Sequence, residues 1–198
     1  MNSGQRFARF VTDVVVRRPA LWRVFRRPLR RTFDRLAPVW DEMRMPEAFA
    51  PVEAALEALP ESPSRVLDLG TGTGSVAQIV ADRYPDAEVT GVDVSQKMID
   101  VARAKPTRVR FEVADAERLP FGDGAFDLVT LGNMIPFFDE LARVTATGGH
   151  VLFAFSGGAG TPIYVSPERL RAELGERGFA EFADFSAGRG TALLARKR

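Results

Sequence analysis

The chain has 198 residues, 45% hydrophobic and 27% charged, a composition typical of one globular domain. It contains no cysteine and only one histidine, His150, which excludes disulfides, thiolate nucleophiles and metal sites built from cysteine or clustered histidine. No apolar run reaches about 18 residues and the basic N-terminus lacks the apolar core of a secretory signal. We therefore expect a cytoplasmic protein with no resident metal.

The first 36 residues are strongly basic, with ten of the 27 basic residues but only two of the 26 acidic ones. Residues 4–17 have the spacing of an amphipathic helix, and Pro19 opens a second helical segment that Pro28 is expected to kink or split. We predict a basic amphipathic helical arm or lid over residues 1–45 and a separate domain over 46–198. The residues predicted to face inward are Phe7, Phe10, Val11, Val14, Val15, Leu21, Trp22, Phe25, Leu29 and Phe33.

Three interpretations of the arm remain open. Its arginines can form a solvated face on helices packed against the body. They can instead form a membrane-surface helix that contacts anionic lipid, with Trp22 at the boundary, leaving the protein cytoplasmic but peripheral at the membrane. Nucleic-acid binding through phosphates is disfavoured, because the polar face carries no interleaved aromatic side chains.

From residue 64 onward, apolar runs of strand length alternate with helical patterns. This alternation is typical of an α/β fold, a parallel sheet wrapped on both sides by helices. The last two strands are joined by Gly188-Arg189-Gly190, which predicts an antiparallel hairpin. The predicted strands are 65–69, 87–93, 108–113, 125–131, 149–156, 179–186 and 191–196, and the predicted helices are 47–59, 75–84, 95–104, 136–146 and 167–177.

A glycine loop follows the first of these strands, with Gly70, Gly72 and Gly74 leading into the helix at 75–84. Glycines let the backbone turn sharply and approach a ligand closely, and the helix directs its free N–H groups toward that ligand. Asp93 ends the next strand at the spacing where a carboxylate meets a ribose in nucleotide-binding βαβ units. The pattern predicts an adenosine-containing cofactor.

The loop differs from the dinucleotide fingerprint, because its third glycine comes one residue early. Asp68 also stands two residues before the first glycine, where a carboxylate would repel a pyrophosphate. S-adenosylmethionine fits better, since it offers a ribose, an α-amino group and a sulfonium but no phosphate.

Three motifs in order resemble the class I S-adenosylmethionine-dependent methyltransferases: Asp68 to Gly74, Asp93, and Val113 to Phe121. The chain is most similar to the ubiquinone/menaquinone C-methyltransferase group, and the resemblance runs from about Phe33 to the C-terminus. It implies a Rossmann-like, doubly wound, seven-stranded sheet that is mostly parallel with an antiparallel last strand. The cofactor crevice should lie at the carboxyl ends of the parallel strands.

The resemblance also implies roles for individual residues. Asp93 would accept from both ribose hydroxyls, although it can also simply cap the helix at Ser95, and Val94 would flank the adenine. Asp115 would accept from the adenine amino group, with the Ala116 amide near a ring nitrogen, or it is a solvated loop acid. The methionine end of the cofactor would be lined by Asp68, Gly70, Thr71 and Gly72. Asp68 can also order the loop.

Asn133 and Met134 follow the fourth strand, where the transferred methyl group should face the acceptor. Asn133 is predicted to bind the amino end of the cofactor, or else the substrate, and Met134 is a substrate-side candidate. Phe33 and Trp40 lie in a segment that resembles one packed over cofactor and substrate in the quinone-pathway enzymes. Tyr164 and Asp139 are weak candidates for a general base, and His150 is expected at the opposite end of its strand. No catalytic base is assigned, and the short segment from Ser156 to Ser166 is expected to leave the substrate side open.

We therefore predict methyl transfer to a small, apolar or lipid-like acceptor. Two alternatives remain: a cofactor-binding domain without catalysis that regulates a partner, and a nucleic-acid methyltransferase that uses the arginine-rich arm. The acceptor atom and the oligomeric state are not determined by the sequence.

Overall fold

Seven strands form one mixed sheet in the order β3-β2-β1-β4-β5-β7-β6 in the computed structural model, which describes residues 3–43 and 46–198. β7 is antiparallel to both of its neighbours, and the pairs among β1 to β5 are parallel, so the predicted Rossmann-like sheet is confirmed. The strands are β1 (Arg65–Leu69), β2 (Glu88–Asp93), β3 (Arg110–Val113), β4 (Phe126–Gly132), β5 (Thr145–Phe155), β6 (Phe179–Ala187) and β7 (Gly190–Lys197).

Helices cover both faces of this sheet. The helices are α1 (Ser3–Arg17), α2 (Trp22–Leu36), α3 (Ala50–Glu57), α4 (Ser75–Arg83), α5 (Gln96–Arg103), α6 (Phe138–Val144) and α7 (Pro167–Gly175). Alternate residues of the central strands point to opposite faces, so Leu67 joins one core cluster with α6 and α7, whereas Val66 joins another with α3, α4 and α5. None of the helices in the described ranges is long and apolar enough to cross a membrane.

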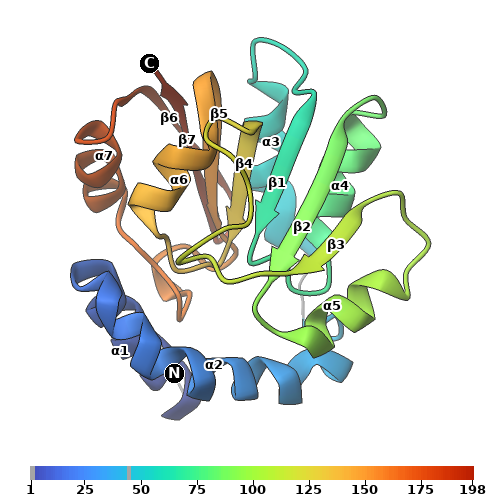
Figure 1. Cartoon of the computed structure of the whole chain (residues 1–198), viewed down its shortest axis with the longest axis vertical. Helices are drawn as coiled ribbons and strands as arrows, with labels where there is room; N and C mark the ends of the chain where they lie inside the picture. The colour runs from blue at the N-terminus through green and yellow to red at the C-terminus, as the bar shows by residue number, and fades with distance from the viewer. Residues whose placement is uncertain (1–2, 44–45) are drawn as a thin grey trace.

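The two arm helices lie along the edge of the sheet where the parallel strands end (Figure 1). Their inner side chains Val11, Val15, Trp22 and Leu29 are buried in the same apolar cluster as the strands. The proposed domain boundary at residues 45 and 46 includes Met45, which lies outside the described residues.

The arm departs from the prediction in two places. Phe7 and Phe10 are 38% and 55% exposed rather than buried in the core, and both pack edge-to-face against Phe25 of α2. α2 also runs through Pro28 without being split. The Val24 carbonyl loses its donor there, but Val24 and Pro28 are both exposed, so water can replace the lost bond.

The predicted helix 136–146 is too long at both ends, and β5 begins at Thr145 rather than at 149. Thr145 pairs with Phe126 of β4, and its hydroxyl donates to the Leu141 carbonyl at 2.7 Å. Strand pairing has therefore displaced the last turn of the helix, as tertiary contacts commonly override local helix preference.

Candidate cofactor site

The glycine loop between β1 and α4 has the conformation that its sequence predicts. Gly70, Gly72 and Gly74 have φ values of +71°, +55° and +87°, a left-handed region that L side chains rarely adopt. The amides of Gly70 and Thr71 both donate to the Val92 carbonyl at 2.9 Å, which ties the loop to the end of β2. The loop is therefore held at the carboxyl edge of the sheet, beside the first turn of α4.

Asp68 lies beneath this loop and is only 1% exposed. One of its oxygens accepts from the Thr130 hydroxyl of β4 at 2.7 Å. The other accepts from the Thr71 hydroxyl at 2.6 Å and from the Ala77 amide at 3.2 Å. These contacts show the loop-ordering role of Asp68, and its second role at the methionine end of a cofactor stays a prediction.

Asp93 ends β2 with both carboxylate oxygens engaged by backbone amides. Oδ2 accepts from the Gly72 amide at 3.0 Å and Oδ1 from the Ser95 amide at 2.8 Å. Burial raises the pKa of Asp93 to about 6; the two amides lower it, and the charges of Asp68 and Asp34 raise it further. Asp93 thus links the glycine loop to the start of α5, next to the half-buried Val94.

Asp115 follows β3 closely and is bound by the N-terminal arm. Its Oδ1 accepts from the Trp22 indole at 2.8 Å and from the Glu117 amide at 3.1 Å. Its Oδ2 accepts from the Arg26 guanidinium at 2.5 Å. Asp115 is therefore not a solvated loop acid, and the neighbouring Ala116 is buried.

Further arm residues reach the same edge of the sheet. Asp34 accepts from the Ser95 hydroxyl at 2.6 Å, beside Asp93. Asp41 accepts from the Thr73 hydroxyl at 2.6 Å and pairs with Lys105 at 2.6 Å. Sequence reasoning assigned no role to these acids, although both lie in the segment that resembles the quinone-pathway enzymes.

Trp22 and Arg26 were also missed as site residues. Nothing in the sequence distinguishes Arg26 from the other arginines of the arm, because only the packing of α2 on the body brings it to Asp115. Trp22 was predicted to face inward, and it is 3% exposed. Its suggested place at a membrane boundary is wrong, since its indole is engaged by Asp115 and stacks edge-to-face on Phe137.

Three of the substrate-side candidates gather around the glycine loop. A Cβ on Gly70 would lie 2.5 Å from the Met134 sulfur, so Met134 packs directly on this glycine. A Cβ on Gly72 would lie 3.5 Å from the Trp40 indole nitrogen, and Trp40 stacks edge-to-face on Phe33 at 5.7 Å. Met134 and Trp40 therefore lie against the glycine loop, and Phe33 lies beside Trp40.

Asn133 and Tyr164 have other neighbours. Asn133 adopts a left-handed backbone with φ of +51°, and its side chain donates to the Ser156 hydroxyl and accepts from the Ser156 amide, joining the ends of β4 and β5. Tyr164 packs on Phe155 and lies under the Arg9 guanidinium of α1. Arg9 also donates to the Ala159 and Thr161 carbonyls, so α1 covers the short segment that was expected to leave the site open.

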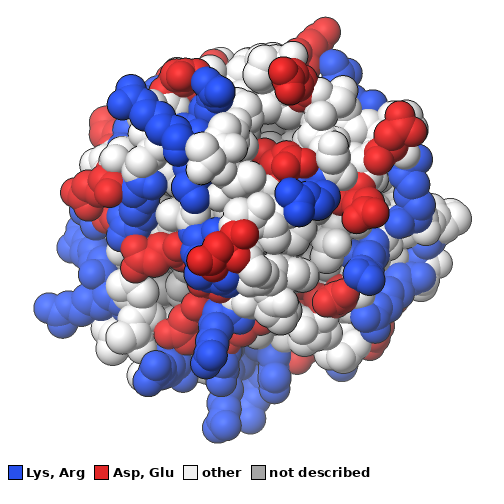
Figure 2. Space-filling view, turned by 45° about the horizontal axis from the view of Figure 1, so that its top comes forward, with Lys and Arg blue, Asp and Glu red and all other residues white. Residues whose placement is uncertain are grey.

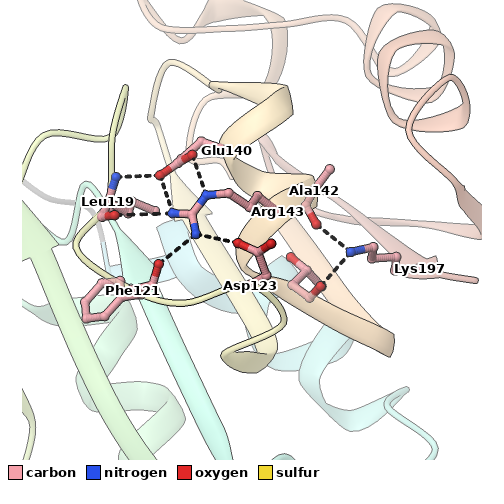
Figure 3. Close-up of polar contacts among 8 residues, drawn as sticks. Leu119, Phe121, Asp123, Glu140, Ala142, Arg143 and Lys197 are labelled. Atoms are coloured by element: carbon pink, nitrogen blue, oxygen red, sulfur yellow. Dashed lines mark hydrogen bonds and ion pairs between the residues drawn. The ribbon is translucent and has the colours of Figure 1, made fainter.

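The loop that carries Asp115 is anchored from α6, as Figure 3 shows. The Arg143 guanidinium donates to the carbonyls of Leu119 and Phe121 and pairs with Glu140 and Asp123. Glu140 in turn accepts from the Leu119 amide at 2.5 Å. Because these contacts bind backbone groups on the loop, they fix the path that the chain follows from β3 to β4.

His150 and Asp139, two residues considered as general bases, lie away from the cofactor site. His150 pairs with Leu128 and Arg196 within the sheet, and burial together with the Arg196 charge lowers its pKa. Asp139 is exposed on α6 and pairs with Arg177 at 2.6 Å. Neither contacts the residues around the glycine loop.

The geometry defines a class of protein. A doubly wound sheet carries a glycine loop after β1, a carboxylate after β2 and a second carboxylate after β3, all at its carboxyl edge, where such folds bind nucleoside cofactors. The carboxylates suit ribose hydroxyls and an adenine amino group, and the loop contains no basic residue for a pyrophosphate.

Comparison with known proteins agrees with this class. Residues 66–149 match the family described as "Methyltransferase domain". A demethylmenaquinone methyltransferase of Thermus thermophilus is 44% identical over 106 residues, 48% of each chain. A malonyl-[acyl-carrier protein] O-methyltransferase of Geobacter sulfurreducens is 38% identical over 150 residues, 67% of this chain and 54% of that one. The chain thus spans about half the length of these relatives.

A solved S-adenosylmethionine-dependent methyltransferase from Aquifex aeolicus shares the fold, with a TM-score of 0.68 at 17% identity over 80% of this chain and 96% of that one. The chain therefore carries a class I S-adenosylmethionine-dependent methyltransferase domain, which confirms the family, the fold and the cofactor class predicted from the sequence. These relatives give no support to the regulatory or nucleic-acid alternatives.

Proposed function

We propose that the protein transfers a methyl group from S-adenosylmethionine to a small, apolar or lipid-like acceptor. The observation that carries this proposal is the convergence of the glycine loop, Asp93 and Asp115 at one edge of the sheet. The names of the relatives support it, since demethylmenaquinone is a lipid-like quinone and malonyl-[acyl-carrier protein] bears a small acyl group.

The chain's own residues would bind and orient the cofactor rather than form a covalent intermediate. Asp93 would accept from the ribose hydroxyls and Asp115 from the adenine amino group, while Gly70, Thr71, Gly72 and Asn133 would flank the methionine end. When bound, S-adenosylmethionine would supply a methyl group that its sulfonium activates for transfer. Alignment of the acceptor and exclusion of water then provide most of the rate enhancement.

The acceptor is proposed to be apolar because of what surrounds the glycine loop. Phe33, Trp40 and Met134 present ring and thioether surfaces there, and none of the three carries a charge. An apolar acceptor would bury its surface against these side chains at about 25 cal/mol per Å². A strongly charged acceptor would find no compensating side chain among them.

Calorimetric titration with S-adenosylhomocysteine tests the cofactor part of the proposal. We expect saturable binding at micromolar ligand, and no binding at millimolar ligand would refute the proposal. Transfer of radiolabelled methyl from S-adenosylmethionine then tests the acceptor. A lipid-soluble demethylated quinol should be labelled, with the same headgroup lacking its isoprenoid tail as the matched control; labelling of a charged small acid but not the quinol would contradict an apolar acceptor.

The proposal includes contact between the arm and an anionic membrane, with the protein otherwise in the cytoplasm. The membrane-facing surface would consist of Phe7, Phe10 and Val24, which are exposed, among the exposed arginines of α1 and α2. In Figure 2, blue side chains crowd the lower edge of the molecule, the edge along which Figure 1 places these helices. Apolar groups amid cationic side chains suit the surface of an anionic bilayer.

Flotation with vesicles of anionic and of neutral phospholipid tests this contact. We expect the wild-type protein to float with anionic vesicles at low salt and the double variant F7S/F10S to remain in the dense fraction. Absence of the wild-type protein from the anionic lipid fraction at low salt would refute the contact while leaving the methyltransfer proposal unaffected.

A further inference from the structure

We propose that helix α2 is a latch that closes the nucleoside half of the cofactor site, and that Trp22 and Arg26 must leave Asp115 before the adenine of the cofactor can bind there. This inference rests on the proposed function, because it concerns how the same site is opened.

The closed latch is seen most directly at Asp115. The carboxylate that would accept from the adenine amino group already accepts on Oδ1 from Trp22 and on Oδ2 from Arg26. The Glu117 amide donates a second hydrogen bond to Oδ1. Each carboxylate oxygen accepts about two hydrogen bonds, so Oδ1 is saturated and Oδ2 is engaged by a cation. The arm therefore presents the same kind of donors that an adenine would bring.

A second contact lies nearer the C-terminal end of the same helix. Asp34 accepts from the Ser95 hydroxyl at 2.6 Å, and Ser95 is the residue whose amide donates to Asp93. Eight residues of helix separate Arg26 from Asp34, about 12 Å along the axis. One helix thus contacts both the acid proposed to bind adenine and the neighbourhood of the acid proposed to bind the ribose.

The methionine half of the site is covered by other side chains. Met134 packs on Gly70, and Trp40 lies over Gly72, so these two residues occupy the side of the loop that a cofactor would approach. Both side chains are partly exposed and lie outside the strands, so we expect side-chain rotation alone to uncover this half of the site. Opening therefore consists of two events, a shift of α2 at the nucleoside end and side-chain rotation at the methionine end.

The contacts of α2 explain why the closed form is stable without being permanent. Trp22 is 3% exposed and Leu29 4% exposed in the core cluster, which favours closure. In contrast, Arg26 is 42% exposed at its side chain, so its ion pair with Asp115 is partly screened by solvent and easily exchanged. A ligand that binds only the open form has its apparent affinity reduced by the fraction of molecules that are closed.

Titration with S-adenosylhomocysteine separates this latch from a simple positioning role for the arm. In R26A and W22F the closed form loses one donor to Asp115, so we expect about three- to tenfold tighter binding than in wild type. R27A is the matched control, because Arg27 is the next residue on the helix, carries the same charge and is exposed. It should bind like wild type.

Two other outcomes of this titration would refute the latch, and they differ in their consequence for the proposed function. If R26A and W22F bind more weakly than R27A, or equally, Arg26 and Trp22 support Asp115 as an acceptor and the latch is refuted while the proposed function stands. If neither wild type nor R26A binds at millimolar ligand, the proposed function itself fails, and the latch fails with it.

A second measurement follows the wild-type protein, and a variant is needed only to assign one signal. Trp22 and Trp40 are the two tryptophans of the chain, so two indole N–H signals are expected in a ¹H–¹⁵N correlation spectrum, with W22F identifying that of Trp22. On saturation with S-adenosylhomocysteine, the Trp22 indole signal should shift and exchange faster with water. A signal that keeps its position and its protection at saturation would overturn the latch.

Discussion

Asp68 and Asp115 were both predicted to contact a cofactor, yet they belong to regions of different character. Asp68 is held within the sheet body by Thr71, Ala77 and Thr130, which are neighbours through β1, α4 and β4. The donors that the arm gives to Asp115 come from Trp22 and Arg26, about 90 residues earlier in the chain. The body thus holds its acid through buried donors, whereas the arm holds its acid through one buried donor, Trp22, and one partly exposed donor, Arg26.

The difference follows from burial. A carboxylate that is 1% exposed must keep every hydrogen bond, because an orphaned buried partner costs its full desolvation free energy. A partly exposed ion pair exchanges its partner for water at small cost. We therefore expect the backbone of the glycine loop at the methionine end to be preformed, with only side chains moving over it, and the nucleoside end to require a shift of α2. Five measurements test this contrast.

The largest effect is expected for D68A. Removing this carboxylate leaves the Thr71 and Thr130 hydroxyls and the Ala77 amide without their acceptor, so the free energy of unfolding should fall by about 3–5 kcal/mol. Denaturant unfolding measures the loss, and D68N, which keeps the shape and one acceptor, should lose less. A loss below about 1 kcal/mol for D68A would show that Asp68 does not order the loop.

R143A should cause the second-largest loss, about 2–3 kcal/mol of the free energy of unfolding. The Arg143 guanidinium binds two loop carbonyls and two carboxylates, although the side chain is 31% exposed. R171A is the matched control. Arg171 makes a surface ion pair with Asp184, and its removal should cost less than about 1 kcal/mol. Equal losses in the two variants would mean that the loop does not depend on Arg143.

D93A should weaken S-adenosylhomocysteine binding by about 1–3 kcal/mol, roughly 5- to 150-fold, since it removes the proposed acceptor for the ribose hydroxyls. Calorimetric titration measures this change. D82A is a suitable control, because Asp82 lies on α4 and pairs only locally with Gln78 among the contacts of the described residues. Unchanged affinity in D93A would place the ribose elsewhere.

Because the pKa of Asp93 is raised, we predict that the stability of the protein falls and its cofactor affinity rises as the pH increases. Its pKa is about 6, against an ordinary 3.8, so its contribution to stability is fully present below 3.8 and is lost as pH rises through 6. Cofactor affinity should change the other way, about tenfold weaker at pH 5 than at pH 7, because protonated Asp93 loses an acceptor. In D93N, stability and cofactor affinity should both depend less on pH. A pH dependence that persists in D93N would come from another titratable group.

The smallest effect on stability is expected for R26A. Its partly exposed ion pair with Asp115 should contribute less than about 1 kcal/mol to the free energy of unfolding, far below the loss in D68A. A loss as large as that of D68A would remove the contrast between the two acids, since the arm would then be as firmly fixed as the body.

The elements of the sheet body could be predicted from local sequence patterns. Local signals are strong there: β1 was predicted over its full observed range, the glycines of the loop have the positive φ values that their spacing indicates, and the last two strands form the predicted hairpin. These features depend on residues close together in the chain, such as Gly70 and Asp93, whose relation is set by one βαβ unit.

The contacts between the arm and the site could not be predicted in this way. Periodicity placed Trp22 and Leu29 inward, but it could not say that Trp22 and Arg26 reach Asp115, that Asp34 reaches Ser95, or that Phe7 and Phe10 stay exposed. A helix pattern reports which face is buried and not which surface covers it. The partners of the arm depend on packing between segments far apart in the chain, and no local sequence pattern encodes that choice.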